Sequence, residues 1–239
     1  MLIRFKLLLK DSSLGRWLYP VIGKIYRIYK VPMRRRKLKE TGYENLRYIY
    51  EVAAKEGIRI IPIFGTLLGF VRDKGFIHGD EDIDLAVLPG ISPKDMAISF
   101  VNKYGFKFNQ ALSYKGKVTE FSLIYNGLST DFYFLDETEN DMRTNIYTWN
   151  KNEAYSDPRQ NNVSIIVHPK IDSLISTTVQ GIDISIPSNA EDLLYAEYGS
   201  GWRVPDPNFK EDSRPGRIKK DDYGYTVTFQ DLIEDNIVK

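Results

Sequence analysis

Between residues 58 and 88 the spacing of the apolar residues changes twice, from strand to helix and back to strand. Residues 58–64 form a short run rich in β-branched side chains, which favour strands, and the run stops at Gly65. Residues 66–72 follow a helical spacing, and residues 83–88 are strand-like again and end at Pro89-Gly90. A strand, a helix and a second strand in such close succession indicate a mixed α+β fold.

The same reasoning predicts further elements on both sides of this unit. Thr41 and Ser92 are typical helix N-caps, and the dipeptide Asn126-Gly127 favours a tight hairpin turn. Residues 136–160 are polar and are expected to form a loop, while the charged tail after residue 205 is expected to be only partly ordered. The expected elements are helices at 41–56, 92–103 and 189–199, a hairpin of 120–125 with 129–135, and strands at 163–167 and 182–186.

Composition excludes several kinds of site. The chain has no cysteine and only two histidines, His78 and His168, which excludes disulfide frameworks, thiolate zinc sites, cysteine nucleophiles and histidine-rich metal sites. Hydrophobic residues make up 42% of the chain, enough for a sizeable core and too much for wholesale disorder. Any chemistry must therefore rely on carboxylates, hydroxyls, amines or a bound metal.

Charge is distributed unevenly along the chain. Residues 1–40 hold 12 Lys and Arg against 2 Asp and Glu, out of 33 and 32 in the whole chain, so this segment carries +10 and the remainder −9. Apolar residues between Leu14 and Tyr29 follow one helical stripe, with basic residues on the other faces. Pro20 is expected to kink this helix or to mark its start, and residues 34–37 add a block of four basic side chains.

Residues 1–40 are therefore expected to form an amphipathic arm that lies on an anionic membrane surface. No apolar run approaches the roughly 18 residues of a spanning helix, so the expected location is cytoplasmic, peripheral on the inner face of the membrane. An alternative is that the apolar stripe packs on the body or on another chain. Nucleic acid is not expected as a partner, because the remainder of the chain is acidic.

An acidic cluster precedes and enters the second strand of the central unit. The spacing of Asp82 and Asp84 places both carboxylates on one face of a strand, with Ile83 facing the core. Asp131, on the hairpin, is a candidate third carboxylate. Hard oxygen ligands without Cys or His favour Mg²⁺ or Mn²⁺, so these residues predict a divalent-metal site.

Candidate phosphate-binding residues lie beside this cluster. Gly65 and Thr66 stand where a strand gives way to a helix, and the free amides and the hydroxyl at such a point can hold a phosphate. Arg72 and Lys74 follow on the same segment and can neutralise negative charge, although a surface salt link is the alternative for both.

The stretch from Gly65 to Asp84, GTLLGFVRDKGFIHGDEDID, closely resembles the LicD and fukutin-type phosphotransferase family, whose signature is similar to G-T-L-L-G-x-x-R-x-x-G-F-I-x-x-D-x-D-I-D. Residues 168–169, 181–187 and 193–205 carry weaker likenesses, so the resemblance covers about 41–205. It departs from the family at His78-Gly79, where many members carry Pro-Trp, and no role is assigned to His78.

The resemblance implies a nucleotidyltransferase-like fold, with a small mixed sheet and flanking helices, for a catalytic domain over residues 41–205, between the arm of residues 1–40 and the tail of residues 206–239. It implies transfer of phosphocholine or a phospho-alditol, such as ribitol or glycerol phosphate, from a CDP-activated donor to a hydroxyl of a free or lipid-linked glycan, with release of CMP. Asp82 and Asp84 would hold the metal, while Asp131 would complete its site or accept the hydroxyl proton. Because the family carries an acid at the position of Asp80, the resemblance also implies that Asp80 is a further ligand or supporting group.

Three alternatives remain open at this point. Trp202 and Arg203 either close over the nucleotide or acceptor or pack at a helix end. The same carboxylates also suit ordinary nucleotidyl transfer, in which a nucleoside triphosphate loses pyrophosphate. A membrane-associated glycan-assembly protein that keeps the fold without activity is the non-catalytic alternative.

Overall fold

A computed structural model describes residues 13–148 and 159–238, with side chains from residue 28 onward except that of Glu211. Its elements run in the order α2 (Ser13–Lys55), β1 (Ile60–Pro62), α3 (Phe64–Leu68), the π-helical turn η1 (Gly69–Asp73), β2 (Ile83–Val87), α4 (Pro93–Tyr104), β3 (Lys107–Tyr114), β4 (Lys117–Tyr125), β5 (Leu128–Phe134), β6 (Asp136–Glu137), β7 (Asp141–Thr148), β8 (Gln160–Pro169), β9 (Leu174–Val179), β10 (Ile182–Pro187), α5 (Ala190–Tyr198), the 3-10 turn η2 (Glu211–Ser213), β11 (Arg217–Val227) and α6 (Phe229–Ile233).

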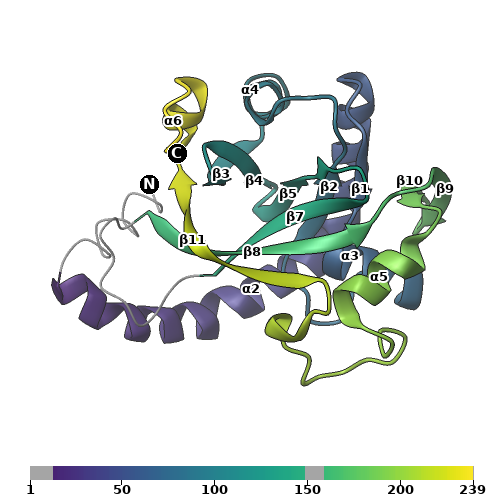
Figure 1. Ribbon diagram of the computed structural model, residues 1–239, viewed down its shortest axis with the longest axis horizontal. Helices are drawn as coiled ribbons and strands as arrows, with labels where there is room; N and C mark the ends of the chain where they lie inside the picture. Colours follow the sequence, from purple (N-terminus) through teal and green to yellow (C-terminus); the bar gives the residue numbers. More distant parts are fainter. Residues whose placement is uncertain (1–12, 149–158, 239) are drawn as a thin grey trace.

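One large sheet organises the molecule and confirms the mixed α+β class (Figure 1). Its nine strands lie in the order β1-β2-β5-β4-β3-β11-β8-β7-β6, and β9 and β10 form a separate two-stranded sheet. Within the described strands, β2 and β5 form the parallel pair of an otherwise antiparallel sheet. The sheet is larger than the small one expected, because β7 and β11 extend it.

Helix α2 is continuous from Ser13 to Lys55, so the prediction that a new helix begins at Thr41 is wrong. The Thr41 hydroxyl does not cap a helix but donates to the Lys37 carbonyl oxygen at 3.0 Å, one turn back. The buried stripe of the helix explains this continuity, because Leu38, upstream of Thr41, is as enclosed as the downstream members of the stripe, Leu46, Ile49 and Val52. The helix also passes through Pro20 without ending.

The segment after residue 205 is also an integral part of the body. Strand β11 lies between β3 and β8, pairing Thr226 with Leu112 and Ile218 with Ile165. The prediction of a partly ordered tail is therefore wrong for residues 217–227. The charged residues at the exposed positions of β11 obscured its strand pattern in the sequence. Its last residue, Val227, is buried in the core.

The predicted hairpin is confirmed as β4 and β5, which pair from Glu120 with Tyr133 to Tyr125 with Leu128. Asn126 and Gly127 both have positive φ, 48° and 77°, as a tight turn of this kind requires. The predicted helix at 92–103 is α4, capped by Ser92.

The prediction of a loop at 136–160 is wrong for the residues that the structure describes, because β6 and β7 lie there. In β7 the side chains of Met142 and Thr144 are buried against β8. Alternate polar residues in β7 concealed this strand pattern in the sequence. Residues 149–158 lie outside the described part of the chain.

Candidate functional site

Strands β2 and β5 bring two of the predicted carboxylates together. Their parallel register pairs Asp84 with Asp131, and paired residues on neighbouring strands project from the same face of the sheet. Asp82 lies two residues before Asp84, immediately before β2 begins. Both Asp84 and Asp131 are partly exposed, so the face that they share is accessible.

The charges of these acids act strongly on one another. Burial raises the pKa of Asp84 well above its ordinary value, and the charges of Asp82 and then Asp131 raise it further. Burial and then the Asp82 charge raise the pKa of Asp131 to about 7, against the opposing effects of Arg34 and the Ser129 hydroxyl. The cluster therefore favours either shared protons or a bound cation.

Asp80 belongs to the same cluster and lies against Gly65. A Cβ added at Gly65 would lie 3.1 Å from Asp80 Oδ2, so the glycine permits the carboxylate to approach the start of α3. Burial, and then the charges of Asp82 and Glu81, raise the pKa of Asp80 to about 6. The structure thus brings together the four acids that the sequence singled out.

Glu120 is a fifth acid of this face that the sequence analysis did not single out. Its side chain is only 8% exposed, and on β4 it pairs with Tyr133, two residues along β5 from Asp131. Burial, followed by the charges of Asp131 and Asp82, raises its pKa well above the ordinary value. The predicted Asn126-Gly127 turn fixes this register, so counting back from the turn would have revealed Glu120.

Thr66 makes a contact different from the predicted phosphate contact. Its side chain is fully buried, and its hydroxyl accepts a hydrogen bond from the Asp84 backbone N–H at 2.9 Å. It therefore fixes α3 against β2 at the position of Asp84. Phe64, two residues before Thr66, has a φ of +50°, which is unusual for a bulky side chain.

Of the two predicted cationic residues, only Arg72 faces the acids. It pairs with Asp73 at 2.8 Å and donates to the Trp202 carbonyl oxygen at 3.3 Å, and its charge lowers the pKa of Asp80. Lys74 is exposed and its Nζ donates to the Val71 carbonyl oxygen at the end of η1, which is a structural contact.

Trp202 packs at the end of a helix with Arg203 against it, the second of the two alternatives that the sequence left open for this pair. Trp202 is buried with Leu67 and Leu68, between α3 and α5. Arg203 is exposed, lies over the Trp202 ring and pairs with Glu191. His78 is exposed.

Two arginines from outside the family resemblance also reach the acidic face. Arg34, on α2, lies 3.4 Å from Asp82 through Nη2 and 3.7 Å from Glu81 through Nη1. Arg214, just before β11, lies 4.8 Å above the Phe64 ring and its charge lowers the pKa of Asp84. The sequence marked Arg34 only as part of the basic block at 34–37, and nothing local marked Arg214, because both contacts depend on how distant segments pack.

The donor set has the chemistry that a hard divalent cation prefers, although no three Asp, Glu or His side chains converge as ready ligands in residues 13–148 and 159–238. Five acids act on one another, and this repulsion is what a cation relieves. Asp82, whose charge raises the pKa of the other four, is paired with Arg34 instead. A cation held by Asp82 would therefore share or replace the Arg34 contact.

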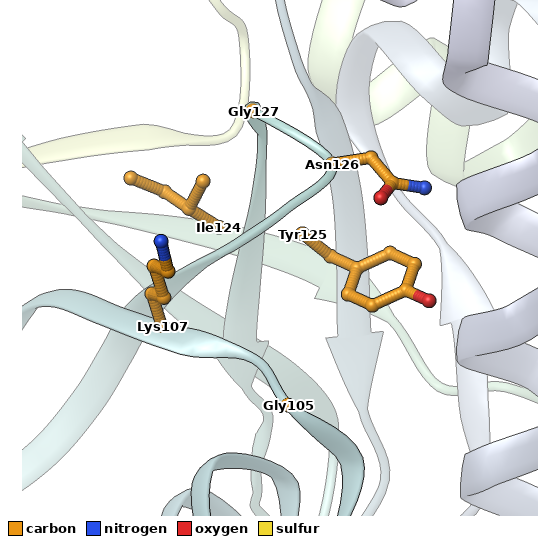
Figure 2. A pocket seen from close by; sticks show the side chains of 6 residues that line it. All are labelled: Gly105, Lys107, Ile124, Tyr125, Asn126 and Gly127. Atoms are coloured by element: carbon orange, nitrogen blue, oxygen red, sulfur yellow. The ribbon is translucent and has the colours of Figure 1, made fainter.

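A separate cavity of about 330 Å³ lies at the β4–β5 turn (Figure 2). Its lining residues are Gly105, Lys107, Ile124, Tyr125, Asn126 and Gly127, and none of the acids is among them. The turn is tied to α2 by hydrogen bonds from Asn45 Nδ2 to the Tyr125 carbonyl oxygen and from Asn126 Nδ2 to Asn45 Oδ1. The cavity therefore adds no group to the acidic site.

No protein-family model matches the chain, and a comparison with curated proteins finds no match either.

Proposed function

We propose that this chain is a metal-dependent phosphotransferase that moves phosphocholine or a phospho-alditol from a CDP-activated donor to a glycan hydroxyl and releases CMP. The observation that carries the proposal is the set of interacting carboxylates on β2, β5 and β4, with Arg72 and Arg34 at its edge. The resemblance of residues 65–84 to the LicD and fukutin-type family supplies the class of donor.

In this reaction a divalent cation, Mg²⁺ or Mn²⁺, would neutralise donor phosphate charge and be held by Asp82 and Asp84, with Asp80 beside them. Arg72 would orient the phosphates, since a guanidinium fork matches phosphate oxygens. Asp131 either completes the ligand set or accepts the proton of the attacking hydroxyl, and Glu120 is the second carboxylate on that face. Thr66 holds the Asp84 backbone in place through its hydroxyl.

The donor class is tested by ligand binding. With Mg²⁺ present, we expect CDP, CDP-choline, CDP-ribitol or CDP-glycerol to raise the thermal midpoint of the whole chain, and UDP-sugars and ATP to leave it unchanged, because ligands that bind the folded state stabilise it. Incubation of the best ligand with acceptor glycans should then release CMP. A midpoint shift with nucleoside triphosphates and release of pyrophosphate would instead establish ordinary nucleotidyl transfer. No shift with any nucleotide would favour the non-catalytic alternative.

We also propose that α2 rests on an anionic membrane and keeps the protein at the inner face of the membrane. Its residues Ile28, Tyr29 and Met33 are 65%, 71% and 49% exposed, beside the basic residues Lys30 and Arg36. Figure 1 shows this part of the helix, in purple, extending past the sheet. No helix in the described ranges is long and apolar enough to cross a bilayer. Exposed apolar side chains next to basic ones suit the headgroup boundary.

The membrane proposal predicts a loss of vesicle binding on substitution of these three residues. Because each side chain would bury apolar surface in the headgroup region, the triple variant Ile28→Ser, Tyr29→Ser, Met33→Ser should partition about tenfold or more weakly into phosphatidylglycerol vesicles. Co-sedimentation measures this partition.

The matched control changes three equally exposed apolar residues elsewhere, Ile175, Tyr195 and Val204, to serine. This control should sediment as the wild type does. If the α2 variant also sediments as the wild type does, α2 is not the membrane contact.

A further inference from the structure

The direction of Arg34 is set by the buried stripe of α2. Leu38, one helical turn later, is 3% exposed and packs into the core, so Arg34 projects from the same face toward the body. Arg36, two residues on, faces solvent with 76% of its side chain exposed and pairs with Glu40, one turn along the same helix. Within the basic block at 34–37, Arg34 therefore faces the acidic site and Arg36 faces solvent.

The ion pairs of Arg34 with Glu81 and Asp82 are close enough to balance charge and longer than tight charge-assisted hydrogen bonds. Its guanidinium bridges two acids, at 3.4 Å from Asp82 Oδ2 and 3.7 Å from Glu81 Oε2, whereas tight charge-assisted hydrogen bonds measure about 2.7–2.9 Å. The side chain remains 28% exposed, and the neighbouring Arg35 also reaches Glu81, at 3.7 Å. Ion pairs of this kind contribute little and are readily exchanged.

Arginines thus border the acidic cluster on two sides. Arg34 and Arg35 approach Glu81 and Asp82 from α2, while Arg72 acts on Asp80 from η1. A site for a phosphate held through a cation needs both kinds of charge, carboxylates for the cation and guanidinium groups for the phosphate oxygens. Of these arginines, Arg34 lies 3.4 Å from Asp82, one of the proposed metal ligands.

We propose that Arg34 is a donor-binding residue: it pairs with Asp82 in the ligand-free chain and turns to the phosphate oxygens of the CDP-linked donor when a divalent cation occupies Asp82. This inference rests on the proposed function and deepens it. The cation and Arg34 compete for one carboxylate, so binding of the cation frees the guanidinium at the place where a diphosphate arrives. The segment expected to lie on the membrane therefore also contributes to the active site.

The test measures the affinities of Mn²⁺ and CDP for the whole chain by titration calorimetry, without membranes. In Arg34→Gln, we expect CDP at saturating Mn²⁺ to bind about 10–100-fold more weakly, because a charge-assisted contact to phosphate is lost. Mn²⁺ alone should bind about 3–10-fold more tightly, because its competitor for Asp82 is gone. Arg34→Lys should restore part of the CDP affinity.

Arg36→Gln, on the solvent face of the same helix, is the matched control and should bind both ligands within about twofold of the wild type. Unchanged thermal midpoints establish that the variants fold. If Arg34→Gln binds both Mn²⁺ and CDP more weakly, the proposal that Arg34 moves from Asp82 to the donor phosphates is overturned. A residue with a merely structural role would give this result. CDP affinity equal to that of the wild type would overturn the inference alone. A wild-type chain that binds no CDP with Mn²⁺ or Mg²⁺ would overturn the proposed function and this inference together.

Discussion

Asp84→Asn should reduce CMP release from the CDP-linked donor by about a thousandfold or more and weaken Mn²⁺ binding, while the thermal midpoint stays near or above that of the wild type. The amide keeps the size of the side chain and removes the charge that a metal would need. Three neighbouring acids raise the pKa of Asp84, so neutralising it also relieves repulsion in the ligand-free chain. The Thr66 hydrogen bond to its backbone N–H is unaffected by the substitution.

Turnover, Mn²⁺ affinity and thermal unfolding of the same preparation check this prediction. Asp136→Asn, an exposed acid on β6, is the control and should behave as the wild type. An Asp84→Asn variant that retains a tenth of the activity would remove Asp84 from the mechanism, and one that unfolds would require Asp84→Glu as the second variant.

Stability should depend on pH through Glu197 of α5. This carboxyl is fully buried 3.5 Å from His168 Nδ1, and burial raises its pKa from 4.5 to about 8, although the Arg214 charge opposes the rise. Burial, and then the Arg214 charge, lowers the pKa of His168 from 6.5 to about 3. Both side chains are therefore neutral in the folded chain between pH 4.5 and 6.5.

The sign of the pH effect follows from the protons that each state binds. Above pH 6.5 the unfolded chain has lost the proton of Glu197 while the folded chain keeps it, so stability falls as pH rises toward 8. Glu197 contributes about 1.4 kcal/mol per pH unit to the slope, a total of about 2 kcal/mol between pH 6.5 and 8. Below pH 6.5 the unfolded chain gains a proton at His168, which offsets the Glu197 effect down to about pH 4.5.

Glu197→Gln should therefore make the stability curve between pH 6.5 and 8 less steep by this contribution, because the amide does not titrate, while the slope that Asp131, Asp84 and Glu120 contribute remains. Urea unfolding at several pH values measures how the free energy of unfolding changes with pH. The test compares this slope between variant and wild type, not the absolute free energies. Glu191→Gln is the control: it changes an exposed residue of the same helix, α5, and should keep the wild-type slope. A wild-type curve that is flat over this range would show that Glu197 ionises normally when buried.

Sequence patterns anticipated the parts of the molecule that local residues determine. The turn at Asn126-Gly127, the cap at Ser92 and the strand that carries Asp84 all follow from neighbours along the chain. The proximity of Asp84 and Asp131 was also anticipated, since it needed only two strands and the period of two along each.

Contacts between distant segments were not anticipated, for definite physical reasons. Thr41 has the chemistry of an N-cap, but the burial of Leu38 continues the helix past it, and only that continuous helix delivers Arg34 to Asp82. Arg214 approaches Phe64 because β11 pairs with β8, and the charged side chains of β11 gave no strand signal. Long-range packing decided both cases, where local propensity pointed elsewhere.

The place of β11 has a consequence for the order in which the protein can be made. In the described part of the chain, the hydrogen-bonded ladders on the two sides of the sheet, β1-β2-β5-β4-β3 and β8-β7-β6, meet only through this strand. During synthesis, neither β3 nor β8 can pair with β11 until residues 217–227 have left the ribosome. The free edges of β3 and β8 therefore stay unpaired until most of the chain has been made. A nascent chain stalled before residue 217 would expose two unpaired strand edges, the state that chaperones bind and that aggregates most readily.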